Sequence, residues 1–220
     1  MIALDFLVYT AFCLLNLLRI SKDLFETYCV QFLSGYTEIK MKKVLILSGS
    51  PRKGGNSDVL CDEFARGARS VGNDVEKIRV VEKKISPCTG CYYCKTSGGR
   101  CAFNDDMTEL LQKIIDCDVL VLSSPVYFYS ICAQLKAVID RTVARWTEIA
   151  NKELYYIATA AEEDSDTLDT TLACFHGFAK CIDGYEEKGT LYGKGVYEKG
   201  DVLKRQELLT IAFEMGESVR

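Results

Sequence analysis

The segment Ser48–Ser57 reads Ser-Gly-Ser-Pro-Arg-Lys-Gly-Gly-Asn-Ser and lies between an expected strand and an expected helix. The run Lys43–Leu47 before it is short, apolar and contains β-branched residues, which predicts a fully buried strand. After it, apolar residues recur at helical spacing from Val59 to Val71. The segment is therefore the loop that joins a buried strand to a helix.

The residues of this loop suit an anion. Gly54 and Gly55 let the backbone turn and approach a ligand closely, and the helix that follows presents free N–H groups and the positive end of its dipole. An ordinary polar turn is the alternative, but such turns rarely collect two glycines, three hydroxyls, an Asn and two cations. We therefore predict a phosphate site formed by Ser48, Ser50, Arg52, Lys53, Asn56 and Ser57.

Two common phosphate motifs are excluded. No Gly-Lys-Ser/Thr follows the glycines, so the loop is not a Walker A motif. It also lacks the G-x-G-x-x-G pattern of dinucleotide-binding folds.

The composition is that of one globular domain with a large core, because the chain has 220 residues, 48% hydrophobic and 26% charged. The net charge of −4 leaves no cationic surplus for a nucleic-acid backbone, so we expect no nucleic-acid partner. Eleven cysteines, an odd number that includes one tight cluster, occur with a single His. This usage indicates a reducing compartment with metal or redox cysteines rather than a disulfide scaffold. We therefore expect a cytoplasmic protein.

Residues 1–40 do not resemble the start of a domain. The apolar stretch Phe6–Leu18 is shorter than a membrane-spanning helix requires, so no membrane partner is expected. Three interpretations stay open: a membrane-associating or partner-binding helix, a pre-sequence, or translation from a codon upstream of a start at Met41. We favour the third, which makes 1–40 an extension and 41–220 one domain.

From residue 41 onward, strand and helix patterns alternate. Five strands separated by helices imply a parallel sheet covered on both faces, and right-handed crossovers favour a doubly wound, flavodoxin-like α/β fold of strand order 2-1-3-4-5. Ligands of such folds bind beyond the carboxyl ends of the strands, here between the first and third. The expected strands are 43–47, 74–81, 118–124 and 153–160, and 189–197 is expected as a fifth strand or an extended segment. A capping box at Asp106–Glu109 opens one helix, and another ends near Trp146.

The third expected strand ends in Ser123–Ser130, which offers backbone amides, hydroxyls and three aromatic side chains. Without regard to their position in the fold, these aromatic side chains would be expected to pack over the hydrophobic core. Their position at the predicted ligand crevice leads us to expect that at least one contacts a ligand ring, Tyr127 before the others.

These segments resemble the flavodoxin-like NADPH-dependent FMN reductases over the whole of 41–220. The resemblance implies an FMN whose isoalloxazine ring is wrapped by Pro125, Val126, Tyr127 and Phe128, with Thr159 as a further contact after the fourth strand. Relatives often carry glycines after that strand, where this chain has alanines and three acids. We interpret Lys136, Asp140 and Arg141 as a salt-bridged helix surface. The motifs that carry the resemblance are Gly49–Arg52, Asn56–Ser57, Ser124–Tyr127, Leu135–Lys136 and Ile139–Arg141.

A second informative motif is Cys88-x2-Cys91-x2-Cys94-x6-Cys101. Bacterial ferredoxins use the same opening spacing to hold an iron–sulfur cluster, whereas zinc sites usually have two separated pairs. The iron–sulfur flavoproteins, a subgroup of the family above, carry such a compact motif after strand two. The spacing favours a [4Fe–4S] cluster, and plain or redox-active thiols stay open as the alternative.

The expected function is therefore that of an FMN-dependent oxidoreductase. NAD(P)H would reduce the flavin, which passes electrons to free flavin, a quinone, an iron–sulfur cluster or a protein acceptor. No catalytic acid–base residues are expected, because the flavin supplies the chemistry. The alternatives are a non-enzymatic electron carrier of flavodoxin type and a phosphate-ester-binding regulatory module without flavin. Since relatives commonly associate, we expect a homo-oligomer.

Overall fold

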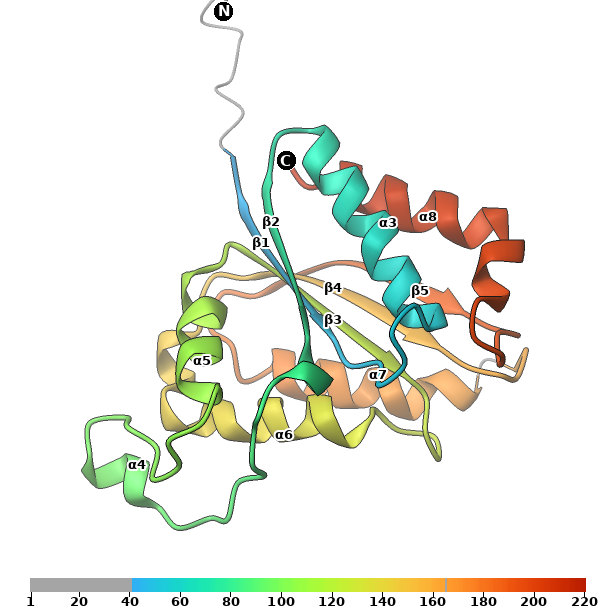
Figure 1. The fold of residues 1–220 in the computed structure, drawn as a ribbon. Helices are drawn as coiled ribbons and strands as arrows, with labels where there is room; N and C mark the ends of the chain where they lie inside the picture. The colour runs from blue at the N-terminus through green and yellow to red at the C-terminus, as the bar shows by residue number, and fades with distance from the viewer. Residues whose placement is uncertain (1–40, 165) are drawn as a thin grey trace, which may run out of the picture. The chain divides into compact units, whose positions relative to one another are not determined.

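The computed structural model describes residues 41–164 and 166–220, so the expectations for 1–40 lie outside the described residues. Its centre is a five-stranded, fully parallel sheet of order β2-β1-β3-β4-β5 (Figure 1). This confirms the doubly wound fold and the strand order. The strands are β1 (Lys43–Ser48), β2 (Asp74–Arg79), β3 (Val119–Pro125), β4 (Glu153–Thr159) and β5 (Glu186–Gly193).

Helices cover both faces of the sheet. Helices α3 (Asn56–Ser70) and α8 (Gln206–Glu217) lie side by side on one face. Helices α5 (Met107–Asp116), α6 (Ala133–Arg141) and α7 (Asp166–Ala179) cover the other face (Figure 1). A short helix, α4 (Tyr93–Thr96), lies in the loop between β2 and α5.

Strand β1 shows how the sequence builds two cores. Its side chains alternate, so that Val44 and Ile46 pack with α3 and α8, while Leu45 and Leu47 pack with the opposite layer. All four are buried, and each contributes roughly 1.5–3 kcal/mol through apolar burial. A continuous apolar run is what a strand covered on both faces requires.

Helices α3 and α8 pack through two glycines. A Cβ on Gly67 would lie 2.0 Å from the carbonyl oxygen of Phe213, and one on Gly216 would lie 2.0 Å from that of Phe64. The two backbones therefore approach each other more closely than any side chain would allow.

Several expected boundaries are wrong. Strand β2 gives way to a 3-10 turn at Val80–Glu82, and β5 spans 186–193 rather than 189–197, which leaves 194–200 as a loop. Helix α6 ends at Arg141, before the 3-10 turns Thr142–Ala144 and Trp146–Glu148. A last 3-10 turn, Asp201–Lys204, precedes α8.

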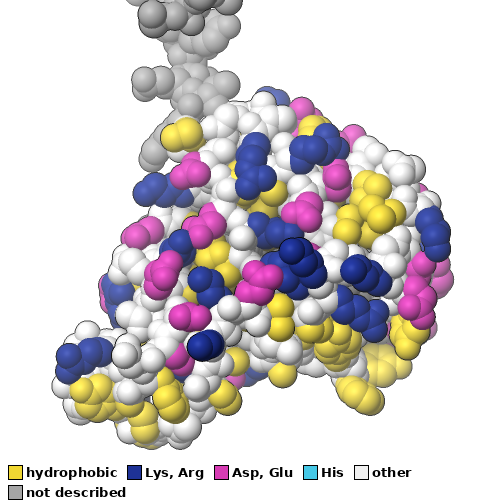
Figure 2. All heavy atoms as spheres, in the orientation of Figure 1, with side chains coloured by type: hydrophobic (Ala, Val, Ile, Leu, Met, Phe, Trp, Pro, Cys, Tyr) yellow, Lys and Arg dark blue, Asp and Glu magenta, His cyan; other side chains and the backbone are white. Residues whose placement is uncertain are grey.

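The expected capping box is also wrong. The Asp106 carboxylate accepts the amide N–H of Lys84 at 2.7 Å and does not cap α5. None of the helices in the described ranges has the length and apolarity that crossing a bilayer requires. The face drawn in Figure 2 intersperses Lys and Arg with Asp and Glu.

Candidate functional site

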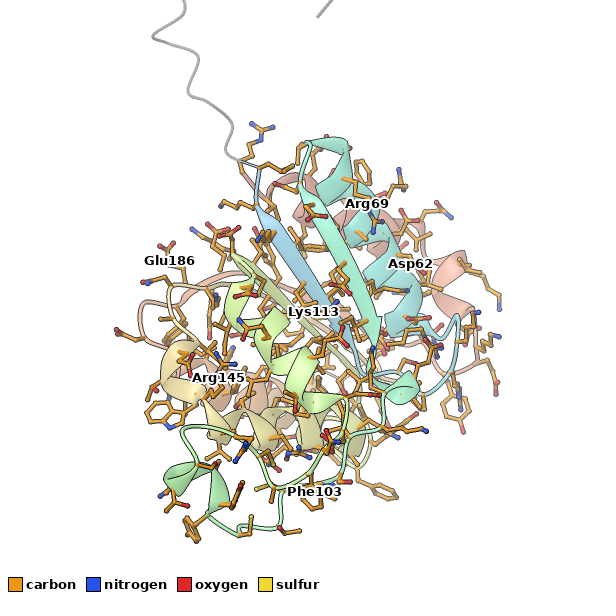
Figure 3. The ribbon with its side chains drawn as sticks, turned by 60° about the vertical axis from the view of Figure 1, so that its left-hand side comes forward. Asp62, Arg69, Phe103, Lys113, Arg145 and Glu186 are labelled. Atoms are coloured by element: carbon orange, nitrogen blue, oxygen red, sulfur yellow. The ribbon has the colours of Figure 1, made fainter. Side chains whose placement is uncertain are left out.

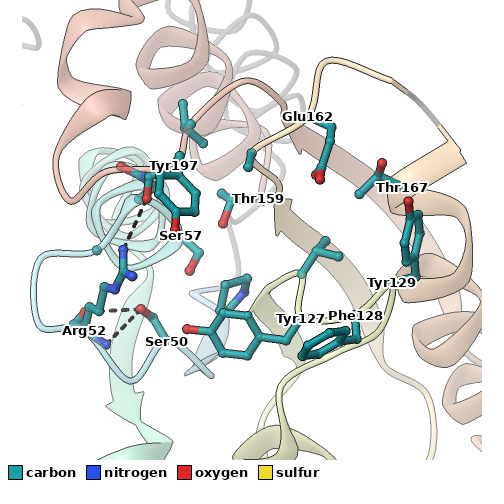
Figure 4. Close-up of a pocket in the computed structure, with 16 residues that line it drawn as sticks. Ser50, Arg52, Ser57, Tyr127, Phe128, Tyr129, Thr159, Glu162, Thr167 and Tyr197 are labelled. Atoms are coloured by element: carbon teal, nitrogen blue, oxygen red, sulfur yellow. Dashed lines mark hydrogen bonds between the residues drawn. The ribbon is translucent and has the colours of Figure 1, made fainter.

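A pocket of about 380 Å³ opens beyond the carboxyl ends of β1, β3 and β4, where the sequence predicted ligand binding (Figure 4). Four segments line it. They are the loop and helix start at Ser50–Ser57, the β3 end at Pro125–Tyr129, the β4 end at Thr159–Glu162 with Thr167 of α7, and Val196–Tyr197.

One end of the pocket is built from the start of α3. Ser57 is buried there, and its hydroxyl is a pocket-lining group without a hydrogen-bond partner among the described residues. Gly54 has φ +65°, and a Cβ on Gly55 would lie 2.8 Å from the Ser50 hydroxyl, so the tight loop depends on both glycines. A buried, unpaired hydroxyl beside a helix N-terminus fits an anionic ligand group.

Arg52 and Asn56 line the same end of the pocket but differ in the hydrogen-bond donors that they leave free for a ligand. The exposed Arg52 donates from Nη1 to the carbonyl oxygen of Tyr197 at 3.2 Å, which leaves its other nitrogens at the pocket (Figure 4). The Asn56 amide is engaged on both sides, because it donates to the carbonyl oxygen of Glu198 at 3.0 Å and accepts the N–H of Val202 at 3.2 Å. We therefore assign the Asn56 side chain to holding the neighbouring loop.

Two residues predicted for the phosphate site lie outside the pocket lining. Ser48 is buried below the loop and donates its hydroxyl to Asp58 at 2.9 Å. Lys53 is exposed and does not line the pocket.

Asp58 supports this site and was not predicted from the sequence, and neither were the lining residues Thr167, Val196 and Tyr197. The Asp58 carboxylate is buried and accepts the amide N–H of Gly54 at 2.9 Å and the ammonium of Lys77 at 3.1 Å. Burial would raise the pKa of Asp58, but the hydrogen bonds from Gly54 and Ser48 and the charge of Lys77 outweigh it, and the pKa is lowered. The available signal was an acidic residue at the third position of a helix, where a carboxylate can reach back to free N–H groups.

The opposite end of the pocket carries the predicted aromatic segment. The N–H of Val126 donates to the carbonyl oxygen of Thr159 at 2.8 Å, which joins the ends of β3 and β4. Tyr127 and Ser130 exchange backbone hydrogen bonds at 3.0 and 3.1 Å, so Phe128 and Tyr129 occupy a tight turn with positive φ of 48° and 59°. Phe128 is fully exposed at the tip of this turn, beside the pocket mouth.

The four clustered cysteines lie in residues 83–106, here called the cysteine loop, between β2 and α5. All four thiols are free; Cys88 and Cys91 are exposed, and Cys94 and Cys101 are half-buried. Four thiols on one short loop have the donor chemistry of an iron–sulfur site. In the part of the chain that the structure describes, however, no three His, Cys, Asp or Glu side chains are grouped as metal ligands, so a cluster would require the loop to draw its thiols together. No residue of this loop lines the pocket.

The helix-surface interpretation of α6 holds for two of its three residues. Lys136 and Asp140 form an exposed ion pair at 2.6 Å. Arg141 is instead buried, with both terminal nitrogens bound to the carboxylate of Asp105 at 2.8 and 2.9 Å. The spacing that predicts a surface ion pair could not show that its third member points inward.

Comparison with known proteins adds to this geometry. The family model described as NADPH-dependent FMN reductase matches residues 42–176. An iron–sulfur flavoprotein of Methanocaldococcus jannaschii is 36% identical over 138 residues, 62% of this chain and 70% of that protein. One of Archaeoglobus fulgidus is 44% identical over 101 residues, 46% of this chain and 45% of that protein. The chain thus spans about half the length of some of its curated relatives.

A solved structure shares the fold. The NAD(P)H:quinone oxidoreductase from Methanothermobacter marburgensis superposes with a TM-score of 0.60 at 19% identity, covering 81% of this chain and 97% of that one.

Proposed function

The chain belongs to the NADPH-dependent FMN reductase family, in its iron–sulfur flavoprotein subgroup, and we propose that the pocket at the carboxyl ends of β1, β3 and β4 holds its FMN. As a member of this family, the chain is an FMN-dependent oxidoreductase. When bound, FMN would supply the redox chemistry between NAD(P)H and an electron acceptor. The residues of the chain bind, orient and shield it.

The observation that carries this proposal is the unpaired Ser57 hydroxyl, buried in the pocket at the N-terminus of α3. A phosphate there accepts that hydroxyl's hydrogen bond and faces the positive end of the helix dipole. The guanidinium of Arg52 adds a charge-assisted bond from the pocket rim. Ser50 completes the phosphate end of the site.

At the other end, Pro125–Phe128 and Thr159 hold the ring. The bond between Val126 and Thr159 fixes the spacing of these two segments at 2.8 Å between N and O, and Tyr127 offers an aromatic face. No acid–base residue is assigned, since the bound flavin would supply the chemistry.

Anaerobic mixing of the FMN-loaded protein with NADPH tests this function. An oxidoreductase bleaches its flavin absorbance directly and at a rate that saturates with NADPH. A flavodoxin-type carrier stays oxidised until a reductase is added. A chain that takes up no FMN would be the regulatory module instead.

We also propose that Cys88, Cys91, Cys94 and Cys101 hold an iron–sulfur cluster that exchanges electrons with the flavin. The names of the archaeal relatives and the four free thiols on one loop support this.

The nine described cysteines are all unpaired, which supports a cytoplasmic location. The acceptor we propose is a quinone or free flavin, with a protein partner as the alternative.

The domain assignment is likewise a proposal. All lining residues of the pocket fall within 41–220, so a chain that starts at Met41 should bind FMN with the same Kd as the full chain.

We propose that this domain associates with itself, and the fully exposed Phe128 beside the pocket supports such a contact. Light scattering of wild-type and Phe128→Ser protein tests the association.

A further inference from the structure

One buried side chain from α6 joins the two ends of the cysteine loop. Arg141 donates from Nη1 to the carbonyl oxygen of Ser86 at 2.7 Å and to Oδ2 of Asp105 at 2.8 Å, and from Nη2 to Oδ1 of Asp105 at 2.9 Å. The same carboxylate accepts the N–H of Ser86 at 3.0 Å. Because Ser86 precedes the first clustered cysteine and Asp105 follows the last, these bonds close the loop at its base.

The closure is specific to an arginine. The two terminal nitrogens of the planar guanidinium donate three hydrogen bonds, one to the Ser86 carbonyl and two to the Asp105 carboxylate. A lysine ammonium cannot reproduce this fixed geometry. Two further bonds join Lys84 and Asp106, one between their backbones and one from the Lys84 N–H to the Asp106 carboxylate, but neither involves a group from α6. Arg141 is therefore the side chain that ties the loop to the body of the domain.

Arg141 also has one nitrogen to spare. Its Nε is buried without a hydrogen-bond partner among the described residues, in a side chain that is 1% exposed. Arg141 and Cys101 together line a second pocket, of about 420 Å³, between the cysteine loop and helices α5 and α6. Figure 3 labels two neighbours of this region, Phe103 on the loop and Arg145 after α6.

The surroundings of Arg141 keep its guanidinium charged beside the cysteine loop. Burial would lower the pKa of Arg141, but Asp105 and then Cys101 outweigh it, so the pKa is raised and the guanidinium stays charged. The Phe103 ring lies 5.1 Å from the guanidinium carbon. Hydrogen bonds and positive charge at cysteine sulfurs are among the factors that set the reduction potential of iron–sulfur sites.

We propose that Arg141 is a positioning residue for the four cysteines: its Nη groups close the cysteine loop, and its guanidinium holds a positive charge in the pocket that it lines together with Cys101. The closure does not depend on a metal. The effect of this charge on the reduction potential rests on the cluster proposed above.

Hydrogen–deuterium exchange of the iron-free full chain tests the closure. Arg141→Gln and Arg141→Lys should both speed exchange of the amides in 84–107 by roughly tenfold, because neither side chain can bind the Ser86 carbonyl and both Asp105 carboxylate oxygens from α6. Lys136→Gln, on the same helix with an exposed partner, should leave that exchange unchanged. If Arg141→Gln does not fold, Asp105→Asn tests the same closure from the loop side. Unchanged exchange in the folded variants would overturn the closure.

The reduction potential of anaerobically reconstituted protein tests the effect of the Arg141 charge. Arg141→Gln removes a positive charge and should shift the potential to a more negative value, while Arg141→Lys should stay closer to wild type. Asp105→Asn leaves the guanidinium uncompensated and should shift the potential to a more positive value. A purely structural role would move both variants in the same direction, which would overturn the charge effect. Wild-type protein that takes up no iron would overturn the charge effect too, whereas the closure is decided by exchange alone.

Discussion

The carboxylate of Asp58 accepts the amide N–H of Gly54 at 2.9 Å, from inside the first turn of α3 back to the loop that precedes it. The same group accepts the Ser48 hydroxyl at 2.9 Å and the Lys77 ammonium at 3.1 Å. These bonds hold the loop in shape without a ligand. They also place Lys77 where it neutralises a negative charge that would otherwise lie beneath the proposed phosphate.

Asp58→Asn should therefore destabilise the protein by about 3 kcal/mol at neutral pH, because it leaves Lys77 and the loop donors poorly paired. The pKa of Asp58 is lowered in the folded state, so its stabilising effect is present above the unfolded pKa of about 3.9 and is lost as the pH falls through the folded value. Urea unfolding as a function of pH measures both effects, and the difference between variant and wild type should shrink below about pH 4.

The matched control is Asp62→Asn. Asp62 binds the same Lys77 at 2.5 Å, but its side chain is 60% exposed, so its loss should cost less than about 1 kcal/mol. Equal losses of unfolding free energy in Asp58→Asn and Asp62→Asn would contradict the role of Asp58 in holding the loop.

Ser57→Ala should leave the stability of the FMN-free protein unchanged or raise it, but should weaken FMN binding. Without FMN, the change removes a buried hydroxyl that has no described partner, so stability should stay the same or rise by up to about 1 kcal/mol. With FMN, it removes a hydrogen bond to the phosphate, and the Kd should rise about tenfold. Thermal unfolding with and without FMN checks both signs; a loss of stability in the free protein would show that the hydroxyl is already satisfied.

Arg52→Ala should weaken FMN but leave riboflavin nearly unaffected, because riboflavin has no phosphate. Since the guanidinium is exposed, solvent screening limits the effect on the FMN Kd to about tenfold. Fluorescence titration with both flavins separates phosphate from ring contacts. Arg66→Ala, an exposed residue of α3 paired with Glu63, should change neither Kd. Equal losses for FMN and riboflavin after Arg52→Ala would place Arg52 at the ring.

The strand order and the position of the pocket could be predicted because they follow from local patterns. Apolar runs such as Lys43–Leu47 indicate buried strands, and parallel strands with right-handed crossovers leave few topologies. The bounds of β5 could not be predicted, because an edge strand whose first three residues are exposed gives no continuous apolar run.

The site was harder to predict, since side-chain direction depends on tertiary partners. Ser48 and Ser57 are both hydroxyls near the same loop, but the partner of Ser48 is Asp58 and only Ser57 lines the pocket. The spacing of Lys136, Asp140 and Arg141 predicts a helix surface, and it could not show that Arg141 pairs inward with Asp105, 36 positions away in the sequence. Such pairings need the folded chain.

Gly216→Ala should destabilise the contact between α3 and α8. The added methyl would lie 2.0 Å from the backbone oxygen of Phe64, so the helices must separate, at a cost of about 1–3 kcal/mol. Gly177→Ala in α7 is the matched control, because its Cβ would meet nothing within 4 Å. That change should stabilise the protein by up to about 1 kcal/mol through helix propensity. Urea unfolding of both variants measures the difference, and a neutral Gly216→Ala would show that the helices can shift freely.

The last prediction concerns the cysteine loop. Anaerobically reconstituted wild-type protein should hold about four irons per chain. Cys91→Ser should lose iron but keep its FMN, because no residue of the cysteine loop lines the pocket. Cys181→Ser, an exposed thiol outside the loop, should keep both.

Iron analysis and flavin absorbance of the same samples check these outcomes. Loss of FMN from Cys91→Ser would mean that the loop supports the flavin site. Wild-type protein without iron, in which the thiols of Cys88, Cys91, Cys94 and Cys101 all react, would assign the loop to thiol chemistry. Electrons from NADPH would then have to leave the flavin through the open side of the pocket, where the exposed Phe128 and Tyr197 stand at its mouth.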